Sequence, residues 1–478
     1  MRRVLYATSE VFPLIKTGGL ADVSGSLPQA LFNIKEDVRI IMPAYAEVMN
    51  QITRYVCMAR IKMSAGEVRI LMTQLPESHV KVWLVDFPGY FDRPGNPYLA
   101  KDGKPWEDNA NRFALFCEVV VEIAMQRTKL KWKPDIVHCN DWQTGLIPVL
   151  LAAENNAPPT LFTIHNLAYQ GLFPYSTFTE LGLDESLWSP ESLEFHEQLS
   201  FIKGGLVYAD KINTVSPRYA EEIQTEKFGF GLEGLLRHRS QHLSGILNGI
   251  NMELWDPETD EHLASTYSIR QLDKKLLNKH ALQSLFGLPN NDQIMLGFIG
   301  RLVPQKGIDI ILQAIHQLMQ LPVQLVFLGT GEYEFQQSLL YFAEEYPERI
   351  AVTIGYDESI AHQIEAGADV FLMPSRFEPC GLNQMYSLRY GTLPVVRPVG
   401  GLVDTVIDAT ADNLESGAAN GFVFEGEQAA DLVATIERLV ALFNDELSWK
   451  KMQMTAMWRD FSWDNSAREY KALYDQLG

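Results

Sequence analysis

Short apolar runs alternate with longer amphipathic stretches along most of the chain. Runs this short, apolar throughout and rich in β-branched residues, are typical of strands buried on both faces of a parallel sheet, and the stretches between them have helical periodicity. The expected strands are Val4–Ala7, Val38–Met42, Val80–Val85, Ile136–Cys139, Leu161–Ile164, Lys211–Val215, Ile294–Ile299, Val323–Leu328, Ile350–Ile354, Val370–Met373 and Leu393–Val396. The alternation predicts an α/β fold with doubly wound parallel sheets and right-handed crossovers.

The alternation is interrupted once, near residues 244–260. The segment 247–256 reads L-N-G-I-N-M-E-L-W-D and is followed by Pro257 and a polar stretch to Asp273. A break of this kind indicates a hinge, so we expect two domains, residues 1–248 and 249–460.

Glycines and charged side chains gather where the expected strands end. Asp141 and His165 each follow a strand of the first half, and Gly300–Arg301 and Ser375–Gly381 follow strands of the second half. Ligands of open parallel sheets bind outside the carboxyl ends of the strands. Two such edges facing each other across a hinge would form a central cleft, which suits a transferase with a nucleotide on one side.

The octet Lys16–Val23 reads K-T-G-G-L-A-D-V. Two glycines entering a helix let backbone N–H groups approach an anion, and Lys16 adds a full positive charge. A tight strand–helix turn with a surface lysine explains the octet equally well. It is neither a Walker A loop nor a G-x-G-x-x-G fingerprint, which disfavours NTPases and dinucleotide enzymes.

Arg301 and Lys306 occur in G-R-L-V-P-Q-K-G, where Pro304 is placed to start a helix. A lysine near a helix N-terminus is disfavoured by the dipole unless an anion binds there. A diphosphate would satisfy both cations, the arginine as a fork and the lysine as a point charge. The alternative is two solvated loop charges.

The segment Ser375–Leu382 reads S-R-F-E-P-C-G-L. Because Glu378 precedes a proline and an expected helix start, capping of that helix is the simpler interpretation. The carboxylate could instead accept hydrogen bonds from sugar hydroxyls, with the amides of residues 380–382 facing the same point. Cys380 has no readable base partner and is expected to be a buried thiol rather than a nucleophile.

Three aromatic residues lie in loops. Tyr356, after a strand end, could stack on a nucleotide base or be an ordinary edge tyrosine. Tyr98 and Trp106 lie in a long Pro/Gly loop and could line a carbohydrate groove, or the loop could pack on itself.

The composition of the chain disfavours several kinds of partner. The 478 residues carry 60 acidic and 40 basic side chains, a net charge of −20 with no basic run, which disfavours nucleic acid and anionic membranes as partners. Four scattered cysteines, no signal peptide and no long apolar segment predict a reduced, cytoplasmic protein. His138, Asp141, His165 and His196 have no metal-ligand spacing, so we expect no metal.

Taken together, these motifs resemble one family, the bacterial glycogen synthases and plant starch synthases of glycosyltransferase family five. H-C-N-D-W, T-I-H-N-L-A-Y-Q-G, K-G-G-L-V-Y-A-D, N-T-V-S-P-R-Y-A, L-N-G-I-N, L-R-Y-G-T-L-P-V-V-R and G-G-L-V-D-T-V also follow its pattern, from about residue 3 to 477. The resemblance implies two Rossmann-like domains facing a cleft (GT-B type) and a C-terminal helix, residues 461–478, that returns to the first domain. It implies retaining transfer of glucose from ADP-glucose, or alternatively UDP-glucose, to the 4-hydroxyl at the non-reducing end of an α-1,4-glucan, without metal or cofactor.

The resemblance also assigns roles to residues of this chain. Lys16, Arg301 and Lys306 would clamp the diphosphate, and Glu378 would bind the transferred glucose. The backbone carbonyl of His165 would face the anomeric carbon. Asp141, Asn166 and Asn248 would orient the sugar, and Tyr356 would stack on the base. Tyr98 would lie on the acceptor side. Backbone amides would come from Gly18, Gly19, Cys380, Gly381 and Leu382.

Some positions depart from the family pattern. Asn140 stands where many bacterial members have His, Asn383 and Val399 replace common threonines, and Tyr386 occupies the place of a second Glu found in other retaining relatives. None of these changes removes a charged site residue. The rival interpretations are a glucan-binding paralogue without activity, which would have lost the clamp, and a nucleotide-sugar epimerase, which would not need an acceptor groove.

Overall fold

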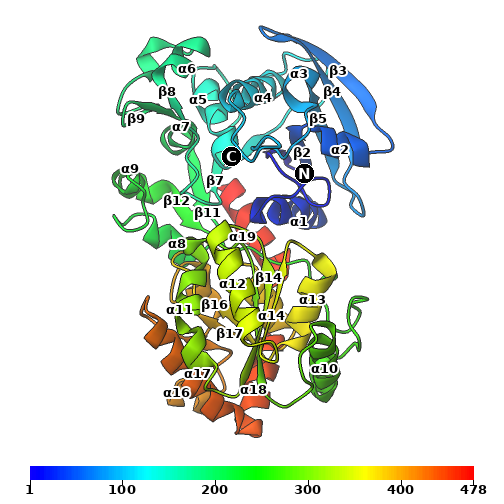
Figure 1. The fold of residues 1–478 in the computed structure, drawn as a ribbon. Helices are drawn as coiled ribbons and strands as arrows, with labels where there is room; N and C mark the ends of the chain where they lie inside the picture. Colours follow the sequence, from blue (N-terminus) through cyan, green and yellow to red (C-terminus); the bar gives the residue numbers. More distant parts are fainter. The chain divides into compact units, whose positions relative to one another are not determined.

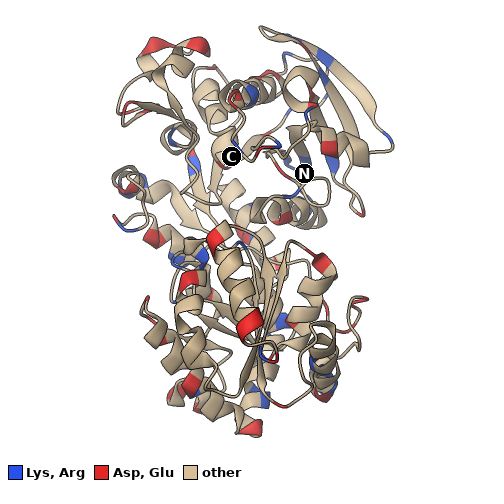
Figure 2. Cartoon of the chain, in the orientation of Figure 1, with Lys and Arg blue, Asp and Glu red and all other residues tan.

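The computed structural model describes all 478 residues, and they form two compact α/β units (Figure 1). Unit 1 comprises Met1–Gly249 together with Trp463–Gly478, and unit 2 comprises Ile250–Ser462. Acidic side chains occur in both units (Figure 2), and most of the net negative charge lies in unit 2. No helix combines the length and apolar character that crossing a bilayer requires.

Unit 1 is built on a nine-stranded sheet with the order β12-β11-β7-β6-β1-β2-β5-β4-β3. Seven of its strands are parallel: β1 (Arg3–Ala7), β2 (Asp37–Pro43), β5 (Lys81–Asp86), β6 (Ile136–Asn140), β7 (Thr160–Ile164), β11 (Lys211–Thr214) and β12 (Leu243–Gly245). In chain order these strands run 3-2-1-4-5-6-7, a doubly wound topology in which the direction of winding reverses between β1 and β6.

Six strands of unit 1 were not expected from the apolar pattern. Besides β12, β3 (Val56–Met63) and β4 (Gly66–Gln74) form an antiparallel hairpin at the sheet edge, and β8 (Leu172–Pro174), β9 (Glu194–Phe195) and β10 (Gln198–Ser200) form a small separate sheet. The hairpin strands alternate buried and exposed residues because only one face is covered. Continuous apolar runs therefore do not detect them.

The helices of unit 1 lie between its strands in the chain, except α19, which comes from the C-terminal end of the chain. They are α1 (Gly19–Asn33), α2 (Ala46–Gln51), α3 (Pro88–Phe91), α4 (Asn109–Ala124), α5 (Leu146–Ala152), α6 (Tyr175–Glu180), α7 (Phe201–Tyr208), α8 (Pro217–Glu222), α9 (Glu233–His238) and α19 (Trp463–Asp475), with short 3-10 turns η1 (Trp142–Thr144), η2 (Glu185–Leu187) and η3 (Ser240–His242). Most residues of α4 are buried, in keeping with apolar residues on most sides of the helix.

The C-terminal helix α19 packs against α1 within unit 1. Its Tyr474 hydroxyl lies 2.8 Å from His138 Nδ1, its Tyr470 hydroxyl accepts from Asn213 Nδ2 at 2.9 Å, and its Ser466 hydroxyl donates to the Leu247 carbonyl at 2.6 Å. Burial holds the pKa of His138 well below its usual value, so its imidazole is neutral. These bonds join α19 to β6, to β11 and to the end of the unit 1 segment.

Unit 2 is built on a six-stranded, wholly parallel sheet with the order β15-β14-β13-β16-β17-β18. Its strands are β13 (Ile294–Ile299), β14 (Val323–Gly329), β15 (Ile350–Ile354), β16 (Val370–Met373), β17 (Leu393–Val396) and β18 (Phe422–Val423). This order is 3-2-1-4-5-6, the dinucleotide-fold arrangement, and it reverses between β13 and β16. The strands of the two units together confirm the predicted α/β class and all eleven expected strands.

The helices of unit 2 cover both faces of its sheet. They are α10 (Lys275–Leu285), α11 (Ile308–Leu318), α12 (Tyr333–Glu345), α13 (Glu358–Gly367), α14 (Asn383–Arg389), α15 (Gly401–Thr405), α16 (Ala411–Ser416), α17 (Ala429–Phe443) and α18 (Glu446–Met457), with 3-10 turns η4 (Ile269–Lys274) and η5 (Pro304–Lys306).

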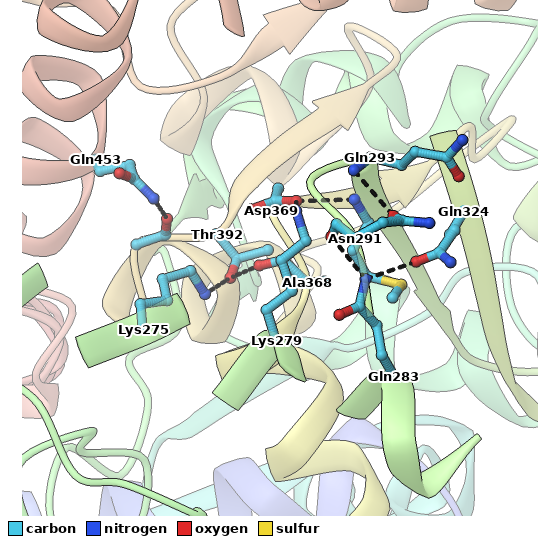
Figure 3. A network of polar contacts seen from close by, with 12 residues as sticks. Lys275, Lys279, Gln283, Asn291, Gln293, Gln324, Ala368, Asp369, Thr392 and Gln453 are labelled. Carbon is cyan, nitrogen blue, oxygen red and sulfur yellow. Dashed lines mark hydrogen bonds and ion pairs between the residues drawn. The ribbon is translucent and has the colours of Figure 1, made fainter. Parts of the chain in front are cut away.

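A buried polar stripe on α10 ties the amino ends of the unit 2 strands together (Figure 3). Lys275, Lys279 and Gln283 are spaced four residues apart and so share one helix face. Lys275 Nζ donates to Thr392 Oγ1 at 2.6 Å, Lys279 Nζ pairs with Asp369 at 2.7 Å, and Gln283 Nε2 donates to the side chain of Gln324 at 2.8 Å. Because the stripe lies at the amino ends of the strands, it stabilises the unit and leaves the carboxyl edge to a ligand.

Candidate active site

In each unit, the predicted charged site residues follow the two strands between which the winding reverses. In unit 1 the loop after β1 carries Lys16 and the loop after β6 begins with Asp141; in unit 2 the loop after β13 carries Arg301 and Lys306, and the loop after β16 carries Glu378. The reversal separates two neighbouring crossovers and leaves a crevice at the carboxyl edge, where open α/β sheets bind ligands. Topology alone therefore gives both loop pairs a ligand-binding position.

The Lys16 loop leads into α1, which begins at Gly19 with an extended Gly18 as its N-terminal flanking residue. Lys16 Nζ pairs with Asp22 Oδ1 at 2.9 Å and lies 5.5 Å from the centre of the Phe12 ring. The Gly18 amide donates to the Glu10 carboxylate at 3.3 Å. The loop thus presents a lysine beside a helix N-terminus, which favours an anionic ligand.

Asp141 has a backbone conformation that few non-glycine residues adopt, with φ 58° and ψ −179°. The conformation is held by its own amide, which donates to the Thr163 carbonyl at 2.9 Å, and by its carbonyl, which accepts from the Thr144 amide at 3.0 Å. Its carboxylate accepts the amides of His165 at 2.7 Å and Asn166 at 3.3 Å. Asp141 therefore fixes the backbone of the loop that follows β7.

Burial dominates the ionisation of this part of unit 1. It raises the pKa of Asp141 to about 7, although the two amides act in the opposite direction. It also lowers the pKa of His165 to about 3, so the imidazole is neutral at physiological pH. Since Asn140 Nδ2 donates to the Ala7 carbonyl at 3.0 Å, its Oδ1 faces His165 and accepts from Nε2 at 2.9 Å.

Three other predicted residues of unit 1 have distinct surroundings. Asn166 uses its side-chain oxygen locally, accepting from the Ala168 amide at 3.0 Å. Asn248 is buried and its Oδ1 has no hydrogen-bond partner within the protein, a rare condition that suits an oxygen reserved for a ligand. Tyr98 is half-buried, with its hydroxyl 2.7 Å from Ser9 Oγ and 2.5 Å from Glu10.

In unit 2 the structure brings Lys306 and Glu378 together. Lys306 ends the turn η5, and Gly307 follows in the left-handed region with φ 70°. Lys306 Nζ lies 2.6 Å from Glu378 Oε2, which also accepts from the Ser375 hydroxyl at 3.1 Å. Arg301 NH2 donates to Gln305 at 3.3 Å on the same loop. A buried carboxylate beside cations is suited to binding sugar hydroxyls next to a diphosphate.

The expectation that Glu378 caps a helix beginning at Pro379 is wrong. Helix α14 begins at Asn383, and its N-terminal flanking residue is Leu382, so the carboxylate of Glu378 is too far along the chain to cap it. The intervening residues Cys380 and Gly381 form a turn instead, with φ 73° at Gly381, and Cys380 is a buried thiol. The simpler interpretation of this motif from sequence therefore fails.

The Glu378–Cys380 backbone rests on Gly400 and Gly401. A Cβ at Gly400 would lie 1.9 Å from the Glu378 carbonyl oxygen, and a Cβ at Gly401 would lie 2.1 Å from that of Cys380. The Gly401 amide donates to the Glu378 carbonyl at 3.2 Å. Only glycine permits this close approach, so the glycine pair holds the Glu378 loop in place.

Tyr356 lies at the carboxyl end of β15, after Gly355, and 68% of its surface is exposed. Its hydroxyl contacts Glu358. An exposed aromatic ring at this edge has a free face for a base.

Sequence reasoning missed two residues that hold the site together, Glu10 and Ser375. Glu10 contacts the Lys16 loop, and Ser375 contacts Glu378. Glu10 has one signal in the sequence, a carboxylate that comes shortly after a buried strand and directly before the apolar residues Val11 and Phe12. Ser375 opens the S-R-F-E-P-C-G-L motif, but nothing in the sequence marks its hydroxyl as a partner of Glu378.

Comparison with known proteins extends these observations to the whole chain. Residues 3–238 match the family model described as the starch synthase catalytic domain, and residues 285–452 match that of the glycosyl transferases group 1. The chain is 55% identical to glycogen synthase 1 of Methylococcus capsulatus, with 99% of this chain and 96% of the relative covered. It is 53% identical to the glycogen synthase of Cellvibrio japonicus over 100% of both chains.

Solved structures show the same relationship. The catalytic domain of starch synthase IV from Arabidopsis thaliana, bound to ADP and acarbose, matches with a TM-score of 0.89 and 31% identity, covering 100% of this chain and 99% of that one. Sucrose-phosphate synthase from Thermosynechococcus elongatus matches with a TM-score of 0.61 and 17% identity over 100% and 99% of the two chains, which shows the shared fold.

Two Rossmann-like units with loops of this kind at their carboxyl edges define a glycosyltransferase of the GT-B class. Within that class, the chain belongs to the glycogen synthase and starch synthase family.

Proposed function

We propose that this enzyme is a glycogen synthase that transfers glucose from ADP-glucose to the 4-hydroxyl at the non-reducing end of an α-1,4-glucan, with retention of anomeric configuration. The observation that carries the proposal is the full-length likeness to a starch synthase catalytic domain bound to ADP and acarbose, which pairs an adenine nucleotide with a glucan-like ligand. The names of the bacterial relatives agree with it.

The proposed chemistry exchanges one bond at the glucose C1 for another. The bond from C1 to the donor diphosphate breaks, the acceptor O4 bonds to C1 on the same face, and the acceptor proton passes to the departing diphosphate. Lys16, Arg301 and Lys306 neutralise the charge that develops on the leaving group, so they bind the transition state more tightly than the ground state. No protein general base is needed in this scheme.

The remaining residues hold the sugar and the base. Glu378 binds hydroxyls of the transferred glucose, with the amides of Cys380, Gly381 and Leu382 nearby. Asp141 fixes the backbone of His165, whose carbonyl faces the positive charge at C1. Asn166 and Asn248 orient the sugar through their side chains.

Three contacts complete the proposed assignment. Tyr356 stacks on the base, Tyr98 lies on the acceptor side, and Gly18 and Gly19 line the donor loop. The donation of the Gly18 amide to Glu10 means that this glycine contributes close approach rather than a free N–H group.

An incorporation assay tests the proposal directly. Radiolabelled ADP-glucose and UDP-glucose are offered in parallel with glycogen as acceptor, and label in the polymer is measured before and after digestion with a glucosidase specific for α-1,4 bonds. We expect faster incorporation from ADP-glucose and complete release of label by the glucosidase. Faster incorporation from UDP-glucose would overturn the donor assignment, and absence of incorporation from both would overturn the activity.

A further inference from the structure

Glu10 is a buried carboxylate to which the proposed chemistry gives no role. Its residue surface is 3% exposed, and it lies in the loop after β1, beside the point where the winding of the unit 1 sheet reverses. A buried charge without partners would strongly destabilise the protein. The hydrogen bonds around the Glu10 carboxylate therefore explain why it is tolerated there.

Each oxygen of this carboxylate accepts from two donors. Oε2 accepts from the backbone amides of Thr17 at 2.5 Å and Gly18 at 3.3 Å. Oε1 accepts from the Thr17 hydroxyl at 2.7 Å and from the Tyr98 hydroxyl at 2.5 Å. One carboxylate therefore joins two segments more than 80 positions apart, the loop that carries Lys16 and the loop that carries Tyr98.

The Tyr98 hydroxyl also lies 2.7 Å from Ser9 Oγ, which is next to Glu10 in the chain, so its position depends on the same short segment. The Thr8 hydroxyl donates to the Glu10 carbonyl at 3.0 Å and fixes the backbone from which the carboxylate projects. The segment after β1 is thus a rigid support for both loops.

We infer that Glu10 is a positioning residue of the transfer site, whose carboxylate holds the Lys16 loop and Tyr98 in a single arrangement and so couples donor binding to acceptor binding. The inference rests on the proposed function, in which Lys16 contacts the donor diphosphate and Tyr98 lies on the acceptor side. A ligand that fixes either loop also fixes the position of the Glu10 carboxylate, and through it the other loop. Donor binding should therefore strengthen acceptor binding by the same factor as acceptor binding strengthens donor binding.

The environment of Glu10 is consistent with a carboxylate that acts through hydrogen bonds rather than by proton transfer. Burial raises the pKa of Glu10, and the bonds from Tyr98, Thr17 and Gly18 offset that rise only in part. Of the other titratable groups near it, Asp141 and Tyr45 interact with it electrostatically. Four donors on one carboxylate favour its ionised form, which is the form that accepts all four.

The test is an initial-rate study of four variants with ADP-glucose and glycogen, each checked by thermal unfolding and by calorimetric binding of ADP alone. In Glu10→Ala both amides lose their acceptor, so we expect the donor KM and the dissociation constant for ADP to rise about tenfold. In Glu10→Gln the amide oxygen can still accept from Thr17 and Gly18 while its NH2 donates to the two hydroxyls, so both constants should stay within about threefold of wild type.

The coupling is measured with Tyr98→Phe in two backgrounds. In the wild-type background, loss of the hydroxyl should raise the donor KM about threefold, because the carboxylate loses one of its anchors. In the Glu10→Ala background it should leave the donor KM unchanged, since the link is already broken. A merely structural role of Glu10 would lower the melting temperature without producing this non-additivity.

A matched control is Glu118→Gln, which neutralises a partly buried carboxylate on α4 and should leave all constants as in wild type. The inference is overturned if folded Glu10→Ala has a donor KM within about twofold of wild type, or if Tyr98→Phe raises the donor KM by the same factor in both backgrounds. If Glu10→Ala does not fold, Glu10→Asp replaces it: a carboxylate drawn back by one methylene should raise the donor KM where Glu10→Gln does not, and equal values overturn the inference.

Failure of the proposed function is recognised separately. It appears in the wild-type enzyme as absent incorporation from both nucleotide sugars. Binding of ADP then still tests Glu10, because the affinity difference between Glu10→Ala and Glu10→Gln does not depend on turnover.

Discussion

The side-chain ammonium of Lys306 lies 2.6 Å from the carboxylate of Glu378, although the two residues are 72 positions apart in the chain. Lys306 comes from the loop after β13 and Glu378 from the loop after β16, the two strands at which the winding of the unit 2 sheet reverses. The residue proposed to bind the diphosphate is thus in direct contact with the residue proposed to bind the sugar. It also keeps a buried carboxylate compensated while no substrate is bound.

Replacement of Lys306 by alanine should reduce kcat by on the order of 10²-fold or more, because a preorganised charge at a developing negative charge supplies several kcal/mol of transition-state stabilisation. Lys274→Ala removes an exposed lysine of the same unit and should leave kcat unchanged. Initial rates of glucose incorporation measure both variants. A Lys306→Ala enzyme with wild-type rates would exclude this lysine from the clamp.

Replacement of Gly401 by alanine should destabilise unit 2 and reduce activity together. The added Cβ would lie 2.1 Å from the Cys380 carbonyl oxygen, so the loop that carries Glu378 must move, at a cost of about 1–3 kcal/mol for overpacking. Gly234→Ala on α9 meets no atom within 4 Å and is the matched control. Denaturant unfolding and incorporation rates measure both, and a fully active, stable Gly401→Ala enzyme would refute the packing argument.

Asp141 should make the folding stability of the protein depend on pH, and Asp141→Asn should remove this dependence. Burial raises the pKa of this carboxyl from 3.8 to about 7, so the folded protein holds a proton that the unfolded chain has released, and stability falls as pH rises between these two values. The asparagine variant has no such proton and keeps an oxygen for the His165 amide. Its melting temperature relative to wild type should therefore improve from pH 4.5 to pH 8.

Asp135→Asn provides the opposite sign for comparison. Arg3 lowers the pKa of the Asp135 carboxyl, so its contribution is present at neutral pH and is lost as pH falls through the lowered pKa. The Asp135→Asn variant should be less stable than wild type at pH 8, and the difference in stability should shrink in acid. If the difference between Asp141→Asn and wild type is constant across the range, the raised pKa is wrong.

His362 should stabilise unit 2 through a buried charge. Its ring stacks on Trp255 at 3.8 Å, its Nδ1 lies 2.7 Å from Asp260 and its Nε2 lies 3.8 Å from Glu358. The Tyr390 hydroxyl shares the Asp260 oxygen at 2.5 Å, and the His262 ring centre lies 4.8 Å away. Burial lowers the pKa of His362, but the two carboxylates outweigh it and raise the pKa to about 9.

The sign of this effect follows from the raised pKa. The contribution is fully present below the unfolded value of 6.5 and is lost as pH rises through about 9, and it amounts to about 3 kcal/mol. His362→Gln should therefore lose most stability relative to wild type at pH 6 and little at pH 10. Denaturant unfolding measures the difference, with His316→Gln, an exposed histidine, as the control. A pH-independent difference would contradict the buried imidazolium.

The apolar pattern predicted the strands well because a strand buried on both faces must be apolar at every position. That argument works for β13 or β16 and fails for β3 and β4, whose exposed face keeps polar residues and breaks the run. The candidate residues at strand ends follow from the same reasoning, since the carboxyl edge of a parallel sheet is a general ligand position. The role of Glu378 is different, because a carboxylate before Pro379 suggests a helix cap until the true start of α14 is seen.

The sequence by itself determined the fold class, the family and the residues that can carry the chemistry, because strand burial and motif spacing are local properties of the chain. The tertiary structure decided which of those residues meet. Lys306 reaches Glu378 because β13 and β16 are neighbours in the sheet, and Glu10 joins the Lys16 loop to Tyr98 because the segment before α4 comes to lie against the segment after β1. It also decided which groups are charged, since the pKa of Asp141 or His165 depends on burial by residues distant in sequence.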